Sequence, residues 1–232
     1  MAASTGRFPY TKIIHAVIWL AIAWFGSAAS AAILGDLTVG SAGTMTVTLT
    51  SFSFGPDPSS TPPGPPWNAE VAAGTSLTFA GCASGVLGSA GCLSATEAIQ
   101  IFSPLTSSTP VPVTSYLTFA AHPSLVYSLN SVGPGSSNTN CAAAVAVGDA
   151  CSPGPGSPLL LTRSATGTTI TFAVAGKASA AGPAGLASGS DYVGQFTAMV
   201  AGQSLQQVQV VLAAGGSVTT SQSGEFVITA VP

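Results

Sequence analysis

The amino-acid sequence predicts an all-β fold, an antiparallel β-sandwich of jelly-roll type with one short α-helix near the C-terminus. Apolar and polar residues alternate with a period of two along most of the chain, which is the spacing of strands with one buried face. Clusters of Gly, Pro, Ser and Asn separate these stretches at short, regular intervals, as turns do in sandwiches. The expected strands are residues 44–54, 76–80, 96–102, 113–120, 125–132, 159–163, 168–176, 192–200 and 217–230.

The first expected strand contains a change of phase. Residues 44–50 alternate strictly, and residues 51–54 continue the alternation shifted by one position. Because a shift of one residue moves side chains to the other face of a sheet, we expect a bulge or corner at Thr50–Ser51. Further along, residues 163–168 separate two expected strands and predict a hairpin turn.

One segment has helical spacing. Its apolar positions are Leu205, Val208, Val211 and Leu212. Ser204 is a suitable N-cap and Gly215 a suitable residue after the C-cap, so we expect a helix over Leu205–Ala214 that lies across the open end or a face of the sheets. A further strand is the alternative, because every second residue here is also apolar, but the two end signals favour the helix.

The first 31 residues predict a secretory signal peptide. Arg7 and Lys12 precede an apolar run over residues 13–25, and Ala29-Ser30-Ala31 forms an A-x-A cleavage pattern. A retained membrane anchor is the alternative, but the run reaches spanning length only by including small residues at its end. We therefore expect residues 32–232 to form one secreted or cell-surface domain with no stable membrane span after signal cleavage.

Four cysteines lie beyond the signal, and nine residues separate the members of each local pair. In an exported protein, an even count with matched spacing predicts two disulfides, Cys82–Cys92 and Cys141–Cys151, although four cysteines allow three pairings. A zinc site is the alternative, but these spacings differ from C-x2-C and His122 is the one histidine beyond the signal. We expect no metal.

Two long loops interrupt the pattern of strands. Residues 55–67 contain six prolines, which lack the N–H that a strand ladder needs, so this Pro-rich loop should be exposed. Residues 133–158 hold the second cysteine pair among Gly-Pro steps, and we expect the disulfide to order this loop.

Charged residues make up 5% of the chain, far below the roughly 25% of ordinary domains. Beyond the signal only Arg163 and Lys177 are basic, against seven acidic residues. So few cations exclude nucleic-acid binding, and the chain lacks both the dinucleotide-binding motif and the P-loop, so we expect no cofactor. A surface with little charge favours self-association.

No local pattern arranges catalytic groups. His122 is the single candidate base, and Ser124 beside it lies in no G-x-S-x-G motif. The acids are not paired in the sequence, and they form no calcium-binding string. We expect Glu97 and Glu225, both within strands, to face solvent. The sequence therefore predicts no catalytic residue. The seven acids are Asp36, Asp57, Glu70, Glu97, Asp149, Asp191 and Glu225.

Trp67 is the one tryptophan beyond the signal and ends the Pro-rich loop. Exposed aromatic rings stack on sugars, so Trp67 is a candidate ligand-binding residue. The simpler interpretation is that its ring packs over the preceding prolines. Tyr116, Tyr127 and Tyr192 lie in expected strands and should pack in the core.

Several strings, read in order after the N-terminal signal, give the chain a resemblance to the exported bacterial PEP-CTERM proteins, which an exosortase sorts. In such proteins the chain often continues as V-P-E-P into an apolar segment and a basic tail, and this sequence ends at Pro232 without that sorting tail. The strings are Gly43-Thr44-Met45-Thr46-Val47-Thr48, the second Cys pair with Ser157-Pro158-Leu159-Leu160-Leu161-Thr162, Gly194-Gln195-Phe196-Thr197, Leu212-Ala213-Ala214-Gly215-Gly216-Ser217-Val218 and Ala230-Val231-Pro232.

The resemblance implies an exported, β-rich surface or matrix protein with no catalytic residues to carry over. The function we expect is that of a secreted or cell-surface, non-catalytic structural or interaction protein of an extracellular matrix or biofilm. Its expected partners are further copies of itself or an extracellular polysaccharide. The alternative is a carbohydrate-binding or adhesive module that uses Trp67.

Overall fold

A computed structural model describes residues 33–40, 44–55, 67–79, 81–101, 105–106, 112–181 and 187–229. The chain divides into two units, Met1–Ser30 and Ala31–Pro232. The first unit, which holds almost all of the predicted signal peptide, lies outside the described residues. All described residues belong to the second unit.

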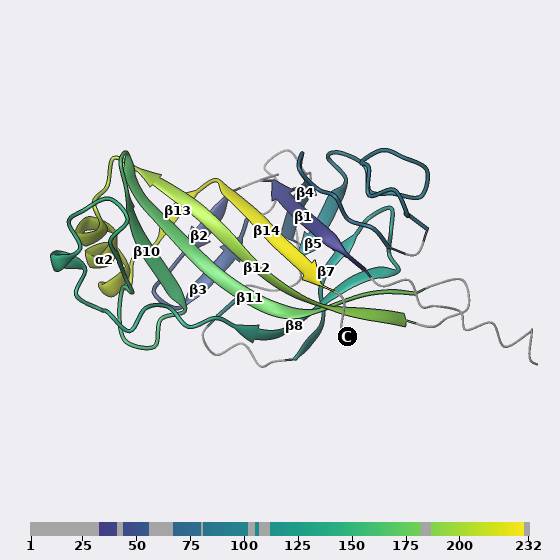
Figure 1. Ribbon diagram of the computed structural model, residues 1–232. Coiled ribbons are helices and arrows are strands. Elements are labelled where there is room, and N and C mark those ends of the chain that lie inside the picture. Colours follow the sequence, from purple (N-terminus) through teal and green to yellow (C-terminus); the bar gives the residue numbers. More distant parts are fainter. Residues whose placement is uncertain are drawn as a thin grey trace, which may run out of the picture. The chain divides into compact units, whose positions relative to one another are not determined.

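The described residues of this unit are mostly antiparallel strands (Figure 1). They also contain one α-helix, α2 (Leu205–Ala213), and one 3-10 turn, η1 (Cys141–Ala143). The strands are β1 (Gly35–Gly40), β2 (Met45–Val47), β3 (Ser51–Phe54), β4 (Trp67–Val71), β5 (Ala98–Ile101), β6 (Leu105–Thr106), β7 (Val113–Phe119), β8 (Leu125–Val132), β9 (Ala150–Cys151), β10 (Leu159–Ser164), β11 (Gly167–Ala181), β12 (Ala187–Ala201), β13 (Val218–Thr220) and β14 (Gln222–Thr229).

Eight strands close into a barrel in the order β1-β4-β5-β7-β8-β11-β12-β14, and β14 returns to β1. Each neighbouring pair is antiparallel, as in the pairs β12–β14 and β14–β1 that complete the ring. The prediction of a jelly-roll sandwich is therefore wrong. An inward-outward alternation of side chains is common to a sandwich and a closed barrel, so the period of two did not distinguish them.

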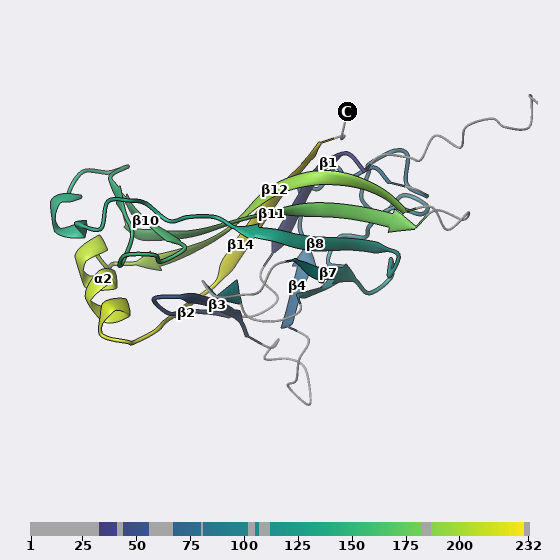
Figure 2. The ribbon, with the colours of Figure 1, turned by 90° about the horizontal axis from the view of Figure 1, so that it is seen from below.

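The hairpin of β11 and β12 is long, so one half of it belongs to the barrel and the other half extends beyond it. Residues 174–180 of β11 pair with β8 in the barrel, whereas residues 167–172 pair with β10, which in turn pairs with β9. A second sheet, in the order β13-β2-β3-β6, packs against this second half of the hairpin. Figure 2 shows β2 and β3 below the hairpin, and the ring centroids of Phe52 and Phe172 lie 4.8 Å apart across the interface.

The expected bulge at Thr50–Ser51 is a hairpin turn between β2 and β3. Met45 pairs with Phe54, and Val47 pairs with Phe52. The turn closes with a hydrogen bond from the Thr48 backbone N–H to the Ser51 carbonyl, 2.9 Å. A tight turn and a bulge both shift the phase of the alternation by one, which is why the sequence suggested the wrong one of the two.

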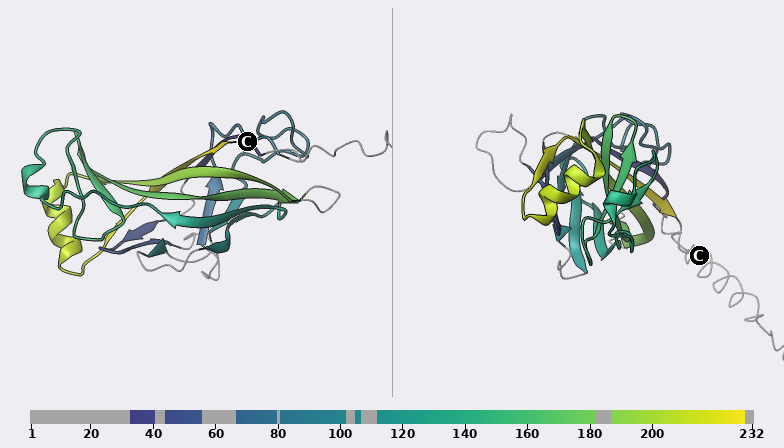
Figure 3. Two further views of the ribbon diagram at one scale, coloured as in Figure 1. Left: turned by 60° about the horizontal axis from the view of Figure 1, so that its bottom comes forward. Right: turned by 90° about the vertical axis from the view of Figure 1, so that its left-hand side faces the viewer.

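The predicted helix is present as α2 and ends one residue earlier than expected. Ser204 is its N-cap: its side chain accepts the Gln207 N–H, and the Gln207 side chain accepts the Ser204 N–H, 2.8 Å, which completes a capping box. Gly215 follows the C-cap with φ +80°. The helix packs against η1, β10, β11 and β13 (Figure 3).

Strands β1, β4, β6 and β9 were not expected from the sequence, and residues 76–79 of the strand expected at 76–80 form no strand. Instead, Thr78 and Phe79 form isolated bridges to Leu34 and Cys82. Most of the other expected strands are present, and β11 and β12 are longer than their alternating segments suggested.

A row of aromatic rings fills the barrel and continues into the hairpin. Tyr127 and Tyr192 have ring centroids 5.2 Å apart, Tyr192 and Phe226 5.7 Å, and Phe226 and Phe196 5.3 Å. Phe196 also approaches Phe54 of the small sheet, at 4.7 Å. All five side chains are buried. We call these five rings the aromatic row.

Three rings of the aromatic row lie directly across from a glycine on the neighbouring strand. The pairs are Gly176 with Tyr192, Gly194 with Phe226, and Gly224 with Phe196. At Gly194 an added Cβ would lie 2.3 Å from the Phe226 ring, closer than carbon atoms can approach. The ring therefore occupies the space that a side chain on the facing strand would need, as aromatic side chains do over strand glycines.

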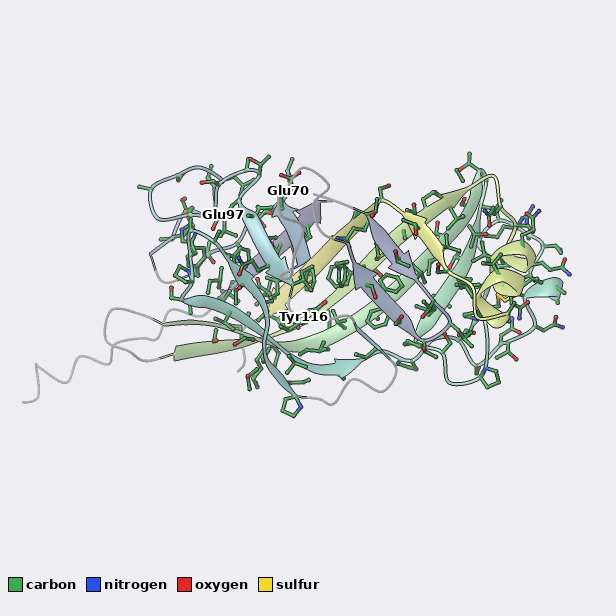
Figure 4. All side chains as sticks on the ribbon, turned by 180° about the vertical axis from the view of Figure 1, so that it is seen from behind. Glu70, Glu97 and Tyr116 are labelled. Carbon is green, nitrogen blue, oxygen red and sulfur yellow. A yellow bond between two sulfur atoms is a disulfide. The ribbon has the colours of Figure 1, made fainter. Side chains whose placement is uncertain are left out.

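A bulge in β7 brings Tyr116 into the barrel. The register of β7 and β8 shifts between Val113 and Leu117, and the consecutive residues Tyr116 and Leu117 are both fully buried. The hydroxyls of Tyr116 (Figure 4) and Tyr127 are buried and bond to no described residue, whereas that of Tyr192 donates to the Ser128 carbonyl, 3.0 Å. Burial raises the pKa of all three tyrosines, and for Tyr116 and Tyr127 the nearby Tyr192 raises it further.

These raised pKa values predict how residues 32–232 respond to alkali, because the three tyrosines of this part of the chain are Tyr116, Tyr127 and Tyr192. Below about pH 10, the ordinary tyrosine pKa, folded and unfolded chains bind the same phenolic protons and the unfolding free energy should not change on their account. Above it, only the unfolded chain loses these protons, so stability should fall as pH rises. Tyrosinate absorbance should then appear together with loss of native circular dichroism. Titration of the tyrosines near pH 10 with the native spectrum retained would contradict this expectation.

Candidate functional site

Both predicted disulfides are present, and no cysteine is free. Cys82–Cys92 closes the loop that precedes β5, with its Cα atoms 4.6 Å apart, and Cys141–Cys151 joins η1 to β9, with its Cα atoms 5.2 Å apart. The second bridge lies in the expected disulfide loop, residues 133–158. In the ranges that the structure describes, no three His, Cys, Asp or Glu side chains come together as metal ligands.

Trp67 is the first residue of β4, and its backbone pairs with Ile101 of β5. Its indole, like residues 56–66 of the Pro-rich loop, lies outside the described part of the chain. The expectation that Trp67 binds a sugar therefore stays a prediction.

The acidic residues of the described ranges lie in different settings. Asp149 caps a turn by accepting the Ala146 backbone N–H, 2.8 Å, and Asp191 forms an exposed ion pair with Lys177, 2.7 Å. Asp36 lies on β1 and Glu70 on β4, both half-buried, and Glu225 faces solvent from β14 as expected. Asp57 falls outside the described residues.

Glu97 does not face solvent, and this prediction is wrong. It ends a turn just before β5, and 3% of its side chain is exposed (Figure 4). Its Oε2 accepts the Ser94 backbone N–H and its Oε1 the Ala121 backbone N–H, both at 3.1 Å. The Nδ1 of His122 lies 2.9 Å from Oε1 and 3.1 Å from Oε2. Four contacts with hydrogen-bond donors explain how a carboxylate is held in the interior.

The pair of Glu97 and His122 is a fixed carboxylate–imidazole unit. Because a carboxylate only accepts hydrogen bonds, these partners assign the proton to Nδ1 of His122, and in the neutral ring Nε2 then carries the lone pair. About 20% of the His122 side chain is exposed, and its ring packs edge-on against Phe79. The pair joins the β7–β8 turn to the start of β5, and no hydroxyl or thiol of a described residue bonds to His122.

Sequence reasoning missed this pair. The two residues are 25 positions apart and come together because β5 and β7 are neighbours in the barrel. A single glutamate and a single histidine in separate segments gave no local signal for the contact.

A hollow of about 650 Å³ lies where β11 changes partner from β8 to β10. Its lining is the end of β8 with residues 133–137 and 156–158, all Gly, Pro or Ser. Ser157 is held in place because its hydroxyl donates to the Leu49 carbonyl, 2.6 Å. The hollow offers hydroxyl and backbone groups to an uncharged polar molecule.

Strands β11, β12 and β14 lie side by side and present one outward face, which we call the outer wall (Figure 1). Small, apolar and uncharged side chains dominate its middle, and charged side chains lie around them. The outer wall consists of Ala173, Ala175, Lys177, Asp191, Val193, Gln195, Glu225 and Val227.

These features define a disulfide-bonded, antiparallel β-barrel protein whose interior is filled by aromatic side chains. The two disulfides fit an oxidising, extracellular compartment. Within the described ranges, no helix has the length and apolar character that crossing a membrane requires. No protein-family model, curated protein or solved structure matches the chain.

The environment of Glu97 predicts that Glu97→Gln destabilises the fold. A glutamine amide has one acceptor oxygen where the carboxylate has two, so one of the buried donors loses its partner, at a cost of about 1–3 kcal/mol in unfolding free energy. Urea denaturation measures this loss. Glu70→Gln on β4 is the matched control and should change stability by less than about 0.5 kcal/mol. Equal stability of Glu97→Gln and wild type would show that the carboxylate does not hold these donors.

Proposed function

We propose that the chain acts outside the cytoplasm as a secreted or cell-surface, non-catalytic structural or interaction protein of an extracellular matrix or biofilm. The observation that carries the proposal is the outer wall, a three-strand surface with solvent-exposed valines at its centre. Exposed apolar groups on adjacent strands are typical of surfaces that bind other molecules. Because the aromatic row fills the interior, we expect binding on the outside.

Three further observations support the proposal. The two disulfides suit the extracellular environment, where few reductants open them. Residues 1–31 have the pattern of a signal peptide. The strings that resemble those of PEP-CTERM proteins suggest an exported surface protein.

The alternative is a carbohydrate-binding or adhesive module. Trp67 favours it by its position, because it begins β4 directly after the Pro-rich segment, and the hollow beside β8 and β10 offers serine hydroxyls to a neutral ligand. Both features suit sugars, which bind through ring stacking and uncharged hydrogen bonds.

Fractionation of the producing cells tests the proposal. We expect the protein in the extracellular or surface fraction, without residues 1–31 and with its four cysteines oxidised. Recovery from the cytoplasm with reduced cysteines would overturn the proposal.

Co-sedimentation with the cells' own extracellular polysaccharide separates the two functions. Binding that Trp67→Ala abolishes, and that the exposed-loop control Val86→Ala leaves unchanged, would favour the carbohydrate-binding module. If protein contacts hold the chain in the matrix instead, neither substitution should change the amount of protein that co-sediments.

A further inference from the structure

We propose that the outer wall is a self-association surface, on which a second copy of this chain packs face to face about a two-fold axis over Val193. In this arrangement Lys177 of each copy meets Glu225 of the other. The inference rests on the proposed function and deepens it by naming the partner.

The centre of the outer wall is apolar and exposed. Val193 is 63% exposed and Val227 40%, and the two are directly paired across β12 and β14. A shallow groove of about 270 Å³ lies beside the two valines, and Ala173, Gly194, Gln195 and Glu225 complete its lining. Covering this groove and its valines removes apolar surface from water, which drives association.

Two charges of the outer wall, Lys177 and Glu225, occupy opposite corners around Val193, while Asp191 lies beside Lys177 and Asp36 of the neighbouring β1 pairs with Val227. Pairing across the strands sets three outward rows: Lys177 beside Asp191, then Ala175 beside Val193 and Val227, then Gln195 beside Glu225. Lys177 on β11 and Glu225 on β14 are therefore diagonal to each other, with Val193 of the middle strand between them. Lys177 already contacts Asp191, whereas Glu225 forms no ion pair with a described residue.

This diagonal makes the outer wall complementary to itself. Consider a two-fold axis that runs parallel to the wall, just above Val193, and perpendicular to the line from Lys177 to Glu225. Rotation about this axis exchanges the positions of Lys177 and Glu225. A second copy related by this axis sets Val193 against Val193 and forms the Lys177–Glu225 contact twice. Such an isologous contact is the usual form of a dimer interface. With strands about 4.8 Å apart and outward residues about 6.8 Å apart along each strand, the strands of the two copies cross steeply, as in orthogonal sheet packing.

A second copy fits this surface better than an acidic partner does. Beyond the predicted signal the chain has two cations, and Lys177 is the one on the outer wall. A polyanion would meet Lys177 together with the carboxylates of Asp191 and Glu225. A copy of the chain supplies an apolar centre and a matching charge at each of the two corners.

Sedimentation velocity of the purified exported protein over a concentration series tests the inference. Wild type should sediment as a concentration-dependent dimer. Val193→Lys, Lys177→Glu and Glu225→Lys should each weaken dimerisation by about tenfold or more. The double exchange Lys177→Glu with Glu225→Lys restores opposite charges between copies and should recover most of the lost affinity. Val210→Lys replaces a valine of similar exposure, 60%, on α2 and should have no effect.

The outcomes separate the inference from simpler explanations. A monomer at every concentration, or a double exchange no better than the single variants, would overturn it. Equal weakening by Val210→Lys would point to general loss of apolar surface and would also overturn it. Thermal unfolding of each variant verifies folding, and Lys177→Gln replaces Lys177→Glu if the new carboxylate beside Asp191 prevents folding.

If the monomeric Val193→Lys variant is still exported and held in the matrix, the proposed function stands without self-association. If wild type dimerises but is never exported, the self-association surface stands and the proposed function fails.

Discussion

The contact between the Phe226 ring and the backbone of Gly194 is the constraint on which the closed fold depends. Phe226 belongs to β14, the strand that joins β12 to β1 and so completes the barrel. Its ring is fully buried and covers the place where a side chain of β12 would otherwise project inward. Tyr192 and Phe196, two residues to either side on β12, contact the same ring. The glycine therefore lets three aromatic rings meet on two adjacent strands, and their packing holds those strands in register.

The elements of the fold were more predictable than their arrangement. Period-two alternation located β7, β8 and β10, and the capping box with its downstream glycine located α2. Matched cysteine spacing gave both disulfides. Closure depends on the pairing of β14 with β12 and β1, and no local pattern marks which strands will pair. The position of Glu97 was missed for the same reason, because its partner His122 lies on a different strand connection and supplies the hydrogen bond that makes burial of a carboxylate tolerable.

The scarcity of charge connects the fold with the proposed function. Beyond the predicted signal the chain has two cations and seven acids, so a second copy can cover most of the surface with few charges to desolvate. The fold places one of these cations on the outer wall beside a pair of exposed valines. Low charge, which from the sequence served mainly to exclude nucleic acid, thus becomes a reason for this surface to bind another protein surface.

The free energy of unfolding of Gly194→Ala, measured by chemical denaturation at low protein concentration, tests the central role of the Gly194–Phe226 contact most directly. The added methyl group would overlap the Phe226 ring, so we expect a loss of about 1–3 kcal/mol or more, partly recovered when Phe226→Leu is added. Gly189→Ala on the same strand is the matched control. A Cβ there would have its nearest neighbour at 3.9 Å, and stability should change by less than about 0.5 kcal/mol. If Gly194→Ala is as stable as wild type, the Phe226 ring does not occupy that space, and this explanation of barrel closure is wrong.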